Sequence, residues 1–263
     1  MTEPESLLLT VGSGAAARDI AVLRRGGAAP GLFWLGGFRS DMGGTKATAL
    51  DAFAARRGLA MTRFDYSGHG ASGGRFEDGT ISRWLEEARA VFERCTSGPQ
   101  VLIGSSMGGW IALLLAEAAR AAGGGAGSRV AGLVLIAPAV DMTKVLMWDA
   151  MKPAVRKKLL KEGGYHVPTA YGEEPYLITR GLIEDGERHL FGDRTIEVGC
   201  PVHILQGVQD KDVPWRHATE LITRLASDDA VLTLVKDGDH RLSRPEDLER
   251  LFAAVEGVIA EAG

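Results

Sequence analysis

The pattern Gly-X-Ser-X-Gly stands at residues 104–108, between an apolar run at 100–103 and a stretch of helix-forming residues at 109–120. A serine in this setting lies on a sharp turn between a strand and a helix, which raises its hydroxyl above the edge of a sheet. The flanking Gly104 and Gly108 suit such a turn, because a side chain at either position would collide with the crowded backbone. The pattern therefore predicts a strand-turn-helix unit that presents Ser106 as a nucleophile.

Apolar runs and helical patterns alternate along the rest of the chain, as is typical of a mostly parallel sheet with helices on both faces. We predict an opening antiparallel hairpin and six further strands, at 7–11, 19–23, 31–35, 60–65, 100–104, 130–136, 202–206 and 231–235. We predict helices at 45–57, 81–95, 107–121, 216–226 and 245–261. The chain is thus expected to be a single α/β domain over residues 1–263 with an eight-stranded sheet.

A serine nucleophile needs a base, and the base needs an acid that orients it. In hydrolases with this serine turn, the acid follows the serine along the chain and the histidine comes last. Asp210 is the preferred acid, because it lies in the turn that follows the apolar run 202–206. Asp212 is the alternative, although its position before a predicted helix also suits a capping residue. Asp141, just after the strand at 130–136, is a third candidate.

His240 is the predicted base, since it follows the last predicted strand in a turn that contains Gly238. The other histidines lie within a strand pattern, in a glycine-rich turn, in the polar central segment or on a helix surface (His203, His69, His166, His189 and His217). None of these positions indicates a catalytic base as clearly as the turn after the last predicted strand does. We therefore predict a triad of Ser106, Asp210 and His240.

The oxyanion of an acyl-transfer reaction needs two preorganised N–H donors. One is expected from the backbone of Met107, the residue after the nucleophile. The second is expected from Phe38, in the loop that follows the strand at 31–35. Gly36 and Gly37 in this loop would allow a substrate to approach the backbone closely. A plain Gly-Gly turn is the alternative, but the position of the loop before a helix favours a functional role.

Residues 141–199 interrupt the alternation and are predicted to form a small helical cap over the site, with helices at 144–162 and 174–189. We place the substrate pocket at Gly37, Met142, Leu146, Trp148 and Trp215. The apolar cap residues could equally pack the cap onto the body. A basic run in the cap is typical of a solvated helix face, with anion binding as the alternative (Lys144, Lys152, Arg156, Lys157, Lys158 and Lys161).

Composition excludes several classes of function. The net charge of −4 gives no reason to expect nucleic acid or an anionic membrane as partner. No apolar run is long enough to span a bilayer. Cys95 and Cys200 form neither a disulfide framework nor a metal-binding pattern, and we expect no metal or organic cofactor. The acidic first residues differ from a signal peptide, so we expect a cytoplasmic protein.

Several motifs together resemble the family of α/β-hydrolase domain-containing protein 10, from about residue 30 to the C-terminus. They are the segments at 41–47, 63–68, 104–110, 210–215 and 239–241. The resemblance implies an α/β-hydrolase fold and assigns the triad roles to Ser106, Asp210 and His240. That family contains a mitochondrial palmitoyl-protein thioesterase that is also described as a mycophenolic acid acyl-glucuronide esterase. Gln206 departs from the family, which has a histidine there, and the missing transit-like N-terminus suggests a bacterial relative.

These observations predict a serine hydrolase that cleaves carboxylic esters or thioesters through an acyl-enzyme. Its expected substrate is a small molecule or an acylated protein. Two alternatives stay open. The first is an acyltransferase or cofactor-free perhydrolase with the same triad, and the second is a non-catalytic ligand receptor on a hydrolase fold. The sequence leaves the choice between monomer and dimer open.

Overall fold

In the part of the chain that the computed structural model describes (residues 3–123, 129–167, 175–226 and 229–262), eight strands form one sheet. The strands are β1 (Glu5–Val11), β2 (Arg18–Arg25), β3 (Ala28–Leu35), β4 (Leu59–Phe64), β5 (Gln100–Ser105), β6 (Val130–Ile136), β9 (Val202–Gly207) and β10 (Ala230–Val235). Their order is β1-β2-β4-β3-β5-β6-β9-β10. β2 runs antiparallel to β1 and β4, and the other neighbours are parallel. The predicted opening hairpin and mostly parallel sheet are confirmed.

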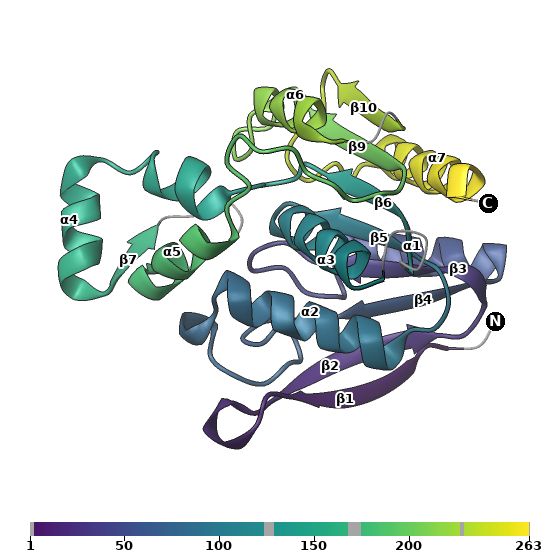
Figure 1. Cartoon of the computed structure of the whole chain (residues 1–263), viewed down its shortest axis with the longest axis horizontal. Coiled ribbons are helices and arrows are strands. Elements are labelled where there is room, and N and C mark those ends of the chain that lie inside the picture. Colours follow the sequence, from purple (N-terminus) through teal and green to yellow (C-terminus); the bar gives the residue numbers. More distant parts are fainter. Residues whose placement is uncertain (1–2, 124–128, 168–174, 227–228, 263) are drawn as a thin grey trace.

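Successive residues of the central strands face opposite sides of the sheet. In β3, Phe33 and Leu35 belong to one apolar core, whereas Leu32 and Trp34 belong to the other. Helices cover both cores, so these strands are buried on both faces and read as continuous apolar runs. The first core packs under α2 (Ile81–Cys95), α3 (Met107–Gly123) and α6 (Trp215–Arg224), and the second under α1 (Thr45–Arg57) and α7 (Pro245–Ala262) (Figure 1).

The five main helices begin and end within two residues of their predicted bounds because local signals mark their ends. Thr80 caps α2, since its side chain accepts the N–H of Arg83 at 3.2 Å. Gly58 ends α1 with a φ of 68°, a left-handed conformation that glycine adopts without strain.

The cap between β6 and β9 differs from the prediction (Figure 1). The expected helix at 144–162 is broken into a π-helical turn, Thr143–Trp148, and α4, Pro153–Glu162. Pro153 causes the break, because it lacks an N–H and forces Lys152 into an extended conformation. The expected helix at 174–189 is also wrong in its first part. Tyr176–Thr179 is a strand, β8, that pairs antiparallel with β7 (Gly164–Val167).

The rest of that predicted helix is α5 (Arg180–Gly186), followed by a short 3₁₀ turn, Glu187–His189. Thr179 caps α5 by accepting the N–H of Leu182 at 3.0 Å. A polar β-branched residue therefore ends the strand and begins the helix. Residue 174 and the residues 168–173 before it lie outside the described part of the chain.

Asp141 joins the beginning of the cap to its end. Its Oδ1 accepts the N–H of Phe191 at 2.8 Å, and its Oδ2 accepts the N–H of Gly192 at 3.0 Å. Asp141 is buried, has a φ of 56° and lies 3.9 Å from Nη1 of Arg224. The third candidate acid thus holds the base of the cap.

Candidate active site

Ser106 lies on a tight turn between β5 and α3, as its motif predicts. Its φ is 54°, its N–H donates to the carbonyl of Ile136 at 2.9 Å, and its own carbonyl accepts the N–H of Ala139 at 3.0 Å. A Cβ at Gly104 would lie 2.4 Å from the carbonyl oxygen of Gly108. A Cβ at Gly108 would lie 2.0 Å from the carbonyl oxygen of Leu35. Both glycines are therefore required by close backbone approach.

His240 and Asp210 meet at the carboxyl ends of β10 and β9. Nδ1 of His240 lies 2.8 Å from Oδ2 of Asp210, and the Asp210 side chain is fully buried. Oδ1 of Asp210 accepts the N–H groups of Asp212 and Val213, both at 2.9 Å. The carboxylate acts only as an acceptor, so Nδ1 of His240 carries the proton and leaves Nε2 available as a base.

Gln206, the residue that departs from the family pattern, supports the same carboxylate. Its amide nitrogen lies 3.1 Å from Oδ2 of Asp210 and 3.0 Å from the carbonyl of Val213. The side chain is completely buried at the end of β9. Its sequence signal was a polar residue inside an apolar strand, directly before the turn that carries the acid.

Asp212, the alternative acid, has an exposed side chain and contributes its backbone N–H to Asp210. Oxygen and nitrogen atoms of Asp210, Asp212 and His240 lie within 4.8 Å of one another, a spacing that could also hold a cation. However, both oxygens of Asp210 already accept hydrogen bonds from N–H groups. This arrangement favours an acid that orients an imidazole over a metal ligand.

The loop after β3 passes beside the nucleophile. A Cβ at Gly37 would lie 3.4 Å from Cβ of Ser106, which shows how closely the two backbones approach. The Phe38 ring packs against Phe76, Trp84 and Tyr176, with centroid distances of 5.0, 5.9 and 5.8 Å. Within the described residues, the N–H groups of Phe38 and Met107 donate to no protein acceptor. The N–H groups of Phe38 and Met107 therefore remain the predicted oxyanion donors.

The loop that carries His240 is held from two sides. Oδ1 of Asp239 accepts the N–H groups of Arg241 and Leu242, both at 3.0 Å. Lys46 of α1 donates to the carbonyl of Arg241, and burial lowers the pKa of Lys46 to about 8. These contacts fix the loop on which the predicted base stands.

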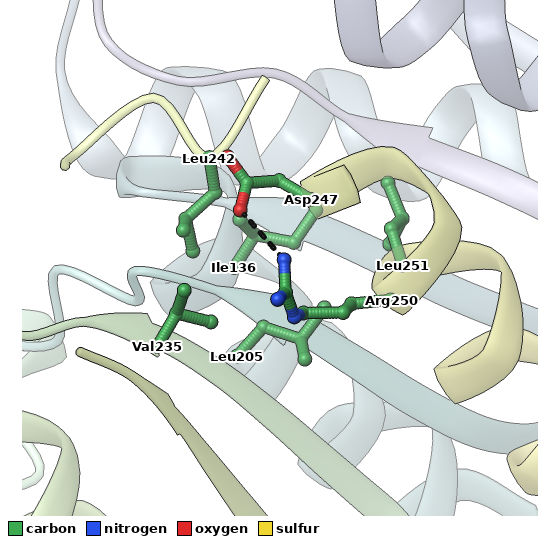
Figure 2. Close-up of a pocket in the computed structure, with 7 residues that line it drawn as sticks. All are labelled: Ile136, Leu205, Val235, Leu242, Asp247, Arg250 and Leu251. Carbon is green, nitrogen blue, oxygen red and sulfur yellow. Dashed lines mark hydrogen bonds and ion pairs between the residues drawn. The ribbon is translucent and has the colours of Figure 1, made fainter. Parts of the chain in front are cut away.

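A small cavity of about 10 Å³ lies behind this loop, between α7 and the ends of β6, β9 and β10 (Figure 2). Its walls are apolar except for Asp247 and Arg250, which form an ion pair at 3.2 Å. Such a cavity has room for about one water molecule. It is therefore part of the support for the loop and too small for a substrate.

A larger cleft of about 370 Å³ opens between the loop after β3, the turn after β4 and the cap hairpin. Arg39 and Tyr176 face each other there, with the guanidinium 5.7 Å from the ring centroid. Burial raises the pKa of Tyr176, and the nearby Asp212 charge adds to this effect. The cleft is mostly polar, lined by Arg39, Ser40, Asp41, Gly68, His69, Gly70, Phe76, Glu77, His166, Pro175, Tyr176 and Leu177.

The residues predicted to line the pocket lie in several places. Gly37 borders the nucleophile, and Met142 is buried in the core beneath α3. Leu146 packs against that core, and Trp148 packs against the small core of the cap, which contains Leu159, Ile178 and Ile183. Trp215 is half-buried under the guanidinium of Arg216. A pocket role for these five residues stays a prediction, and Met142 is the one among them that is buried in the first core.

The basic residues of the cap contact other parts of the cap. Lys144 pairs with Asp149 at 2.6 Å, and Arg156 donates to the carbonyl of Trp148 at 2.9 Å. Lys158 lies 3.8 Å from Glu162. These contacts favour the interpretation of a solvated helix face.

Comparison with known proteins identifies the family. The family model described as serine aminopeptidase, S33 (Hydrolase_4) matches residues 34–180. The mouse palmitoyl-protein thioesterase ABHD10, a mitochondrial protein, is 34% identical over 242 residues, which cover 92% of this chain and 79% of the relative. The chain belongs to the α/β-hydrolase superfamily, in the ABHD10 family.

Two solved structures agree with this assignment. The structure of mouse α/β-hydrolase domain-containing protein 10 has a TM-score of 0.86 and 31% identity, and the match covers 98% of this chain and 100% of that one. A crystal structure of a protein from Agrobacterium vitis S4, assigned as a hydrolase, has a TM-score of 0.93 and 49% identity, with the same coverage. The predicted α/β-hydrolase fold is therefore confirmed.

The expectation of a cytoplasmic protein is contradicted by these relatives. The mouse and human ABHD10 proteins are both named as mitochondrial. The expectation rested on an acidic first segment, and this feature does not specify a compartment physically. Within the described residues, no helix combines the length and apolar character needed to cross a membrane.

Proposed function

We propose that this member of the ABHD10 family is a serine hydrolase that cleaves carboxylic esters or thioesters through an acyl-enzyme on Ser106. The main support is the 2.8 Å hydrogen bond between His240 and Asp210, which leaves one imidazole nitrogen free to act as a base. The close approach of Gly37 to Ser106 supports an oxyanion hole built from the N–H groups of Phe38 and Met107.

In the proposed mechanism, Oγ of Ser106 attacks the acyl carbonyl carbon while Nε2 of His240 takes the hydroxyl proton. Asp210 stabilises the resulting imidazolium, and the two N–H groups stabilise the oxyanion. The bond to the leaving oxygen or sulfur then breaks, and His240 returns the proton to that atom. Water attacks the acyl-enzyme with His240 again as base, which releases the acid and restores Ser106.

We propose acylated thiols as one substrate class, because the matching relatives are named palmitoyl-protein thioesterases. The acyl chain would then lie between the nucleophile and the half-buried Leu146 and Trp148 of the cap. Measurement of kcat/KM on p-nitrophenyl esters from acetate to palmitate, and on palmitoyl thioesters, shows how the rate depends on acyl length and on the leaving atom. Each buried methylene contributes about 0.8 kcal/mol at most, so kcat/KM should rise by up to about 15-fold for every two carbons.

Replacement of the nucleophile tests the reaction itself. Ser106→Ala should lower kcat by about 10⁴-fold or more and abolish labelling by a fluorophosphonate probe. Ser105→Ala is the matched control, because Ser105 ends β5 one residue before the turn, and this variant should keep most of its activity. Turnover by Ser106→Ala within tenfold of the parent would refute the proposal. Adding alcohols or peroxide as competing acceptors separates hydrolysis from acyl transfer and perhydrolysis.

A further inference from the structure

The turn after β4 holds the loop after β3 through His69. Nε2 of His69 lies 3.0 Å from the backbone nitrogen of Arg39, and Nδ1 lies 3.1 Å from the carbonyl oxygen of Ser67. The Arg39 nitrogen can only donate and the Ser67 oxygen can only accept. Nδ1 therefore carries the proton, and Nε2 is the acceptor. Burial lowers the pKa of His69, which is consistent with this neutral ring.

Arg39 needs such a partner because of its backbone conformation. Its φ is 61°, in the left-handed region that a residue with a side chain adopts only where its surroundings hold it. Arg39 is an inner residue of a turn in which the N–H of Ser40 donates to the carbonyl of Gly37 at 3.0 Å. The imidazole thus holds the middle of this turn.

The turn at residues 37–40 also fixes the direction of the Phe38 N–H group. The carbonyl of Gly37 and the N–H of Phe38 belong to the same planar peptide group. The hydrogen bond from Ser40 to Gly37 therefore also orients the Phe38 N–H, the proposed oxyanion donor. Loss of the contact between His69 and Arg39 would allow the turn to relax and this N–H to rotate away.

The surroundings of His69 allow it little freedom. Its ring packs against Tyr66, Phe76 and Trp84, with centroid distances of 5.9, 5.2 and 5.3 Å. Phe76 and Trp84 also pack against the Phe38 ring. Farther along the loop, Oδ1 of Asp65 accepts the N–H of Met42 at 2.6 Å, so the turn after β4 holds the loop at two points.

We propose that His69 is a positioning residue: through Arg39 it holds the turn at residues 37–40 so that the Phe38 N–H faces the oxyanion formed at Ser106. This inference rests on the proposed function. His69 contacts neither the nucleophile nor the proton that is transferred, so its effect is on the stabilisation of the transition state.

Two substitutions at His69 test whether the hydrogen-bond acceptor matters, or only the volume that the ring fills. His69→Phe keeps an aromatic ring but removes the acceptor, and it should lower kcat about 10²-fold with KM changed less than about threefold. This is the loss expected when one oxyanion donor is misaligned. His69→Gln offers an amide oxygen near the position of Nε2 and should stay within about tenfold of the parent. Affinity for a boronic acid transition-state analogue should fall in parallel with kcat/KM.

His203→Phe serves as the control, because it removes a half-buried imidazole that pairs with Thr233 far from the loop. It should leave kcat unchanged.

Nitrogen NMR of the parent adds a test that needs no variant, since it should report His69 as the Nδ1–H form. An Nε2–H form would overturn the inference, and so would full kcat in His69→Phe or equal damage in both His69 variants. If Ser106→Ala is inactive in those cases, the proposed function still stands.

Discussion

Asp210 and Asp212 are two residues apart, yet their carboxylates have different surroundings. Asp210 is buried and accepts hydrogen bonds from Gln206, Asp212, Val213 and His240. Such a set of donors holds a carboxylate in one orientation. The Asp212 side chain lies at the surface.

Replacement of each acid by its amide should therefore give very different results. Asp210→Asn should lower kcat by about 10⁴-fold, because the amide favours the wrong tautomer of His240. Asp212→Asn should lower it by less than about tenfold, because the substitution keeps the backbone N–H that donates to Asp210. Steady-state kinetics on one p-nitrophenyl ester measures both, and the reverse order would transfer the orienting role to Asp212.

At the scale of residues, the sequence identified the groups whose position follows from a motif. Ser106 and His240 stand where a strand ends, and their order along the chain limits the choice. The support by His69 could not be predicted, because it acts through a contact with another segment. Gln206 supports Asp210 from only four positions away, as a polar residue in an apolar strand. His69 reaches Arg39 across 30 positions, and nothing in its glycine-rich turn indicates that partner.

Among the elements, the cap depends most on contacts between distant segments. The main strands and helices are long enough for their periodicity to be read, whereas β7 and β8 have only four residues each. β7 and β8 are strands because they pair with each other, and they stand on opposite sides of Pro168 in the sequence. Short strands of this kind give no period that distinguishes them from a helix.

The contact of Asp141 with the end of the cap gives a prediction at this scale. Asp141→Asn tolerates the positive φ but loses one acceptor, so an N–H of Phe191 or Gly192 is left unpaired. The free energy of unfolding should fall by about 1–3 kcal/mol, measured by urea denaturation. Hydrogen exchange in α4 and α5 should increase more than in the sheet. Asp149→Asn, which breaks an exposed pair with Lys144, should cost less than about 1 kcal/mol.

Across the whole molecule, several histidines share one electrostatic property. Burial lowers the pKa of each of them (His69, His189, His203 and His217). The folded state therefore keeps these rings neutral at a pH where the unfolded chain already takes up protons. Below about pH 6.5 the unfolded state binds more protons than the folded state, so acid shifts the equilibrium towards unfolding.

The free energy of unfolding should thus decrease when the pH is lowered from 7.5 to 5.5. Urea titrations at the two pH values measure the difference. The His203→Phe variant should show a smaller decrease, because one of the titrating rings is absent. Equal or greater stability at pH 5.5 would contradict this account of the buried histidines.

The overall architecture was predictable for a physical reason. Helices cover both faces of the sheet, so the central strands read as apolar runs between helical segments, and this pattern repeats along the chain. The compartment of the protein was not predictable in this way, because the acidic first residues contribute to neither of the two cores.

Ser106 has a φ of 54°, and only glycine adopts that conformation without strain. A glycine at this position would relieve about 1 kcal/mol of backbone strain, so the chain would fold more stably without the proposed nucleophile. Selection for stability alone would remove the hydroxyl. The fold itself therefore gives no reason for a side chain at this position, whereas the proposed acyl-enzyme requires its hydroxyl.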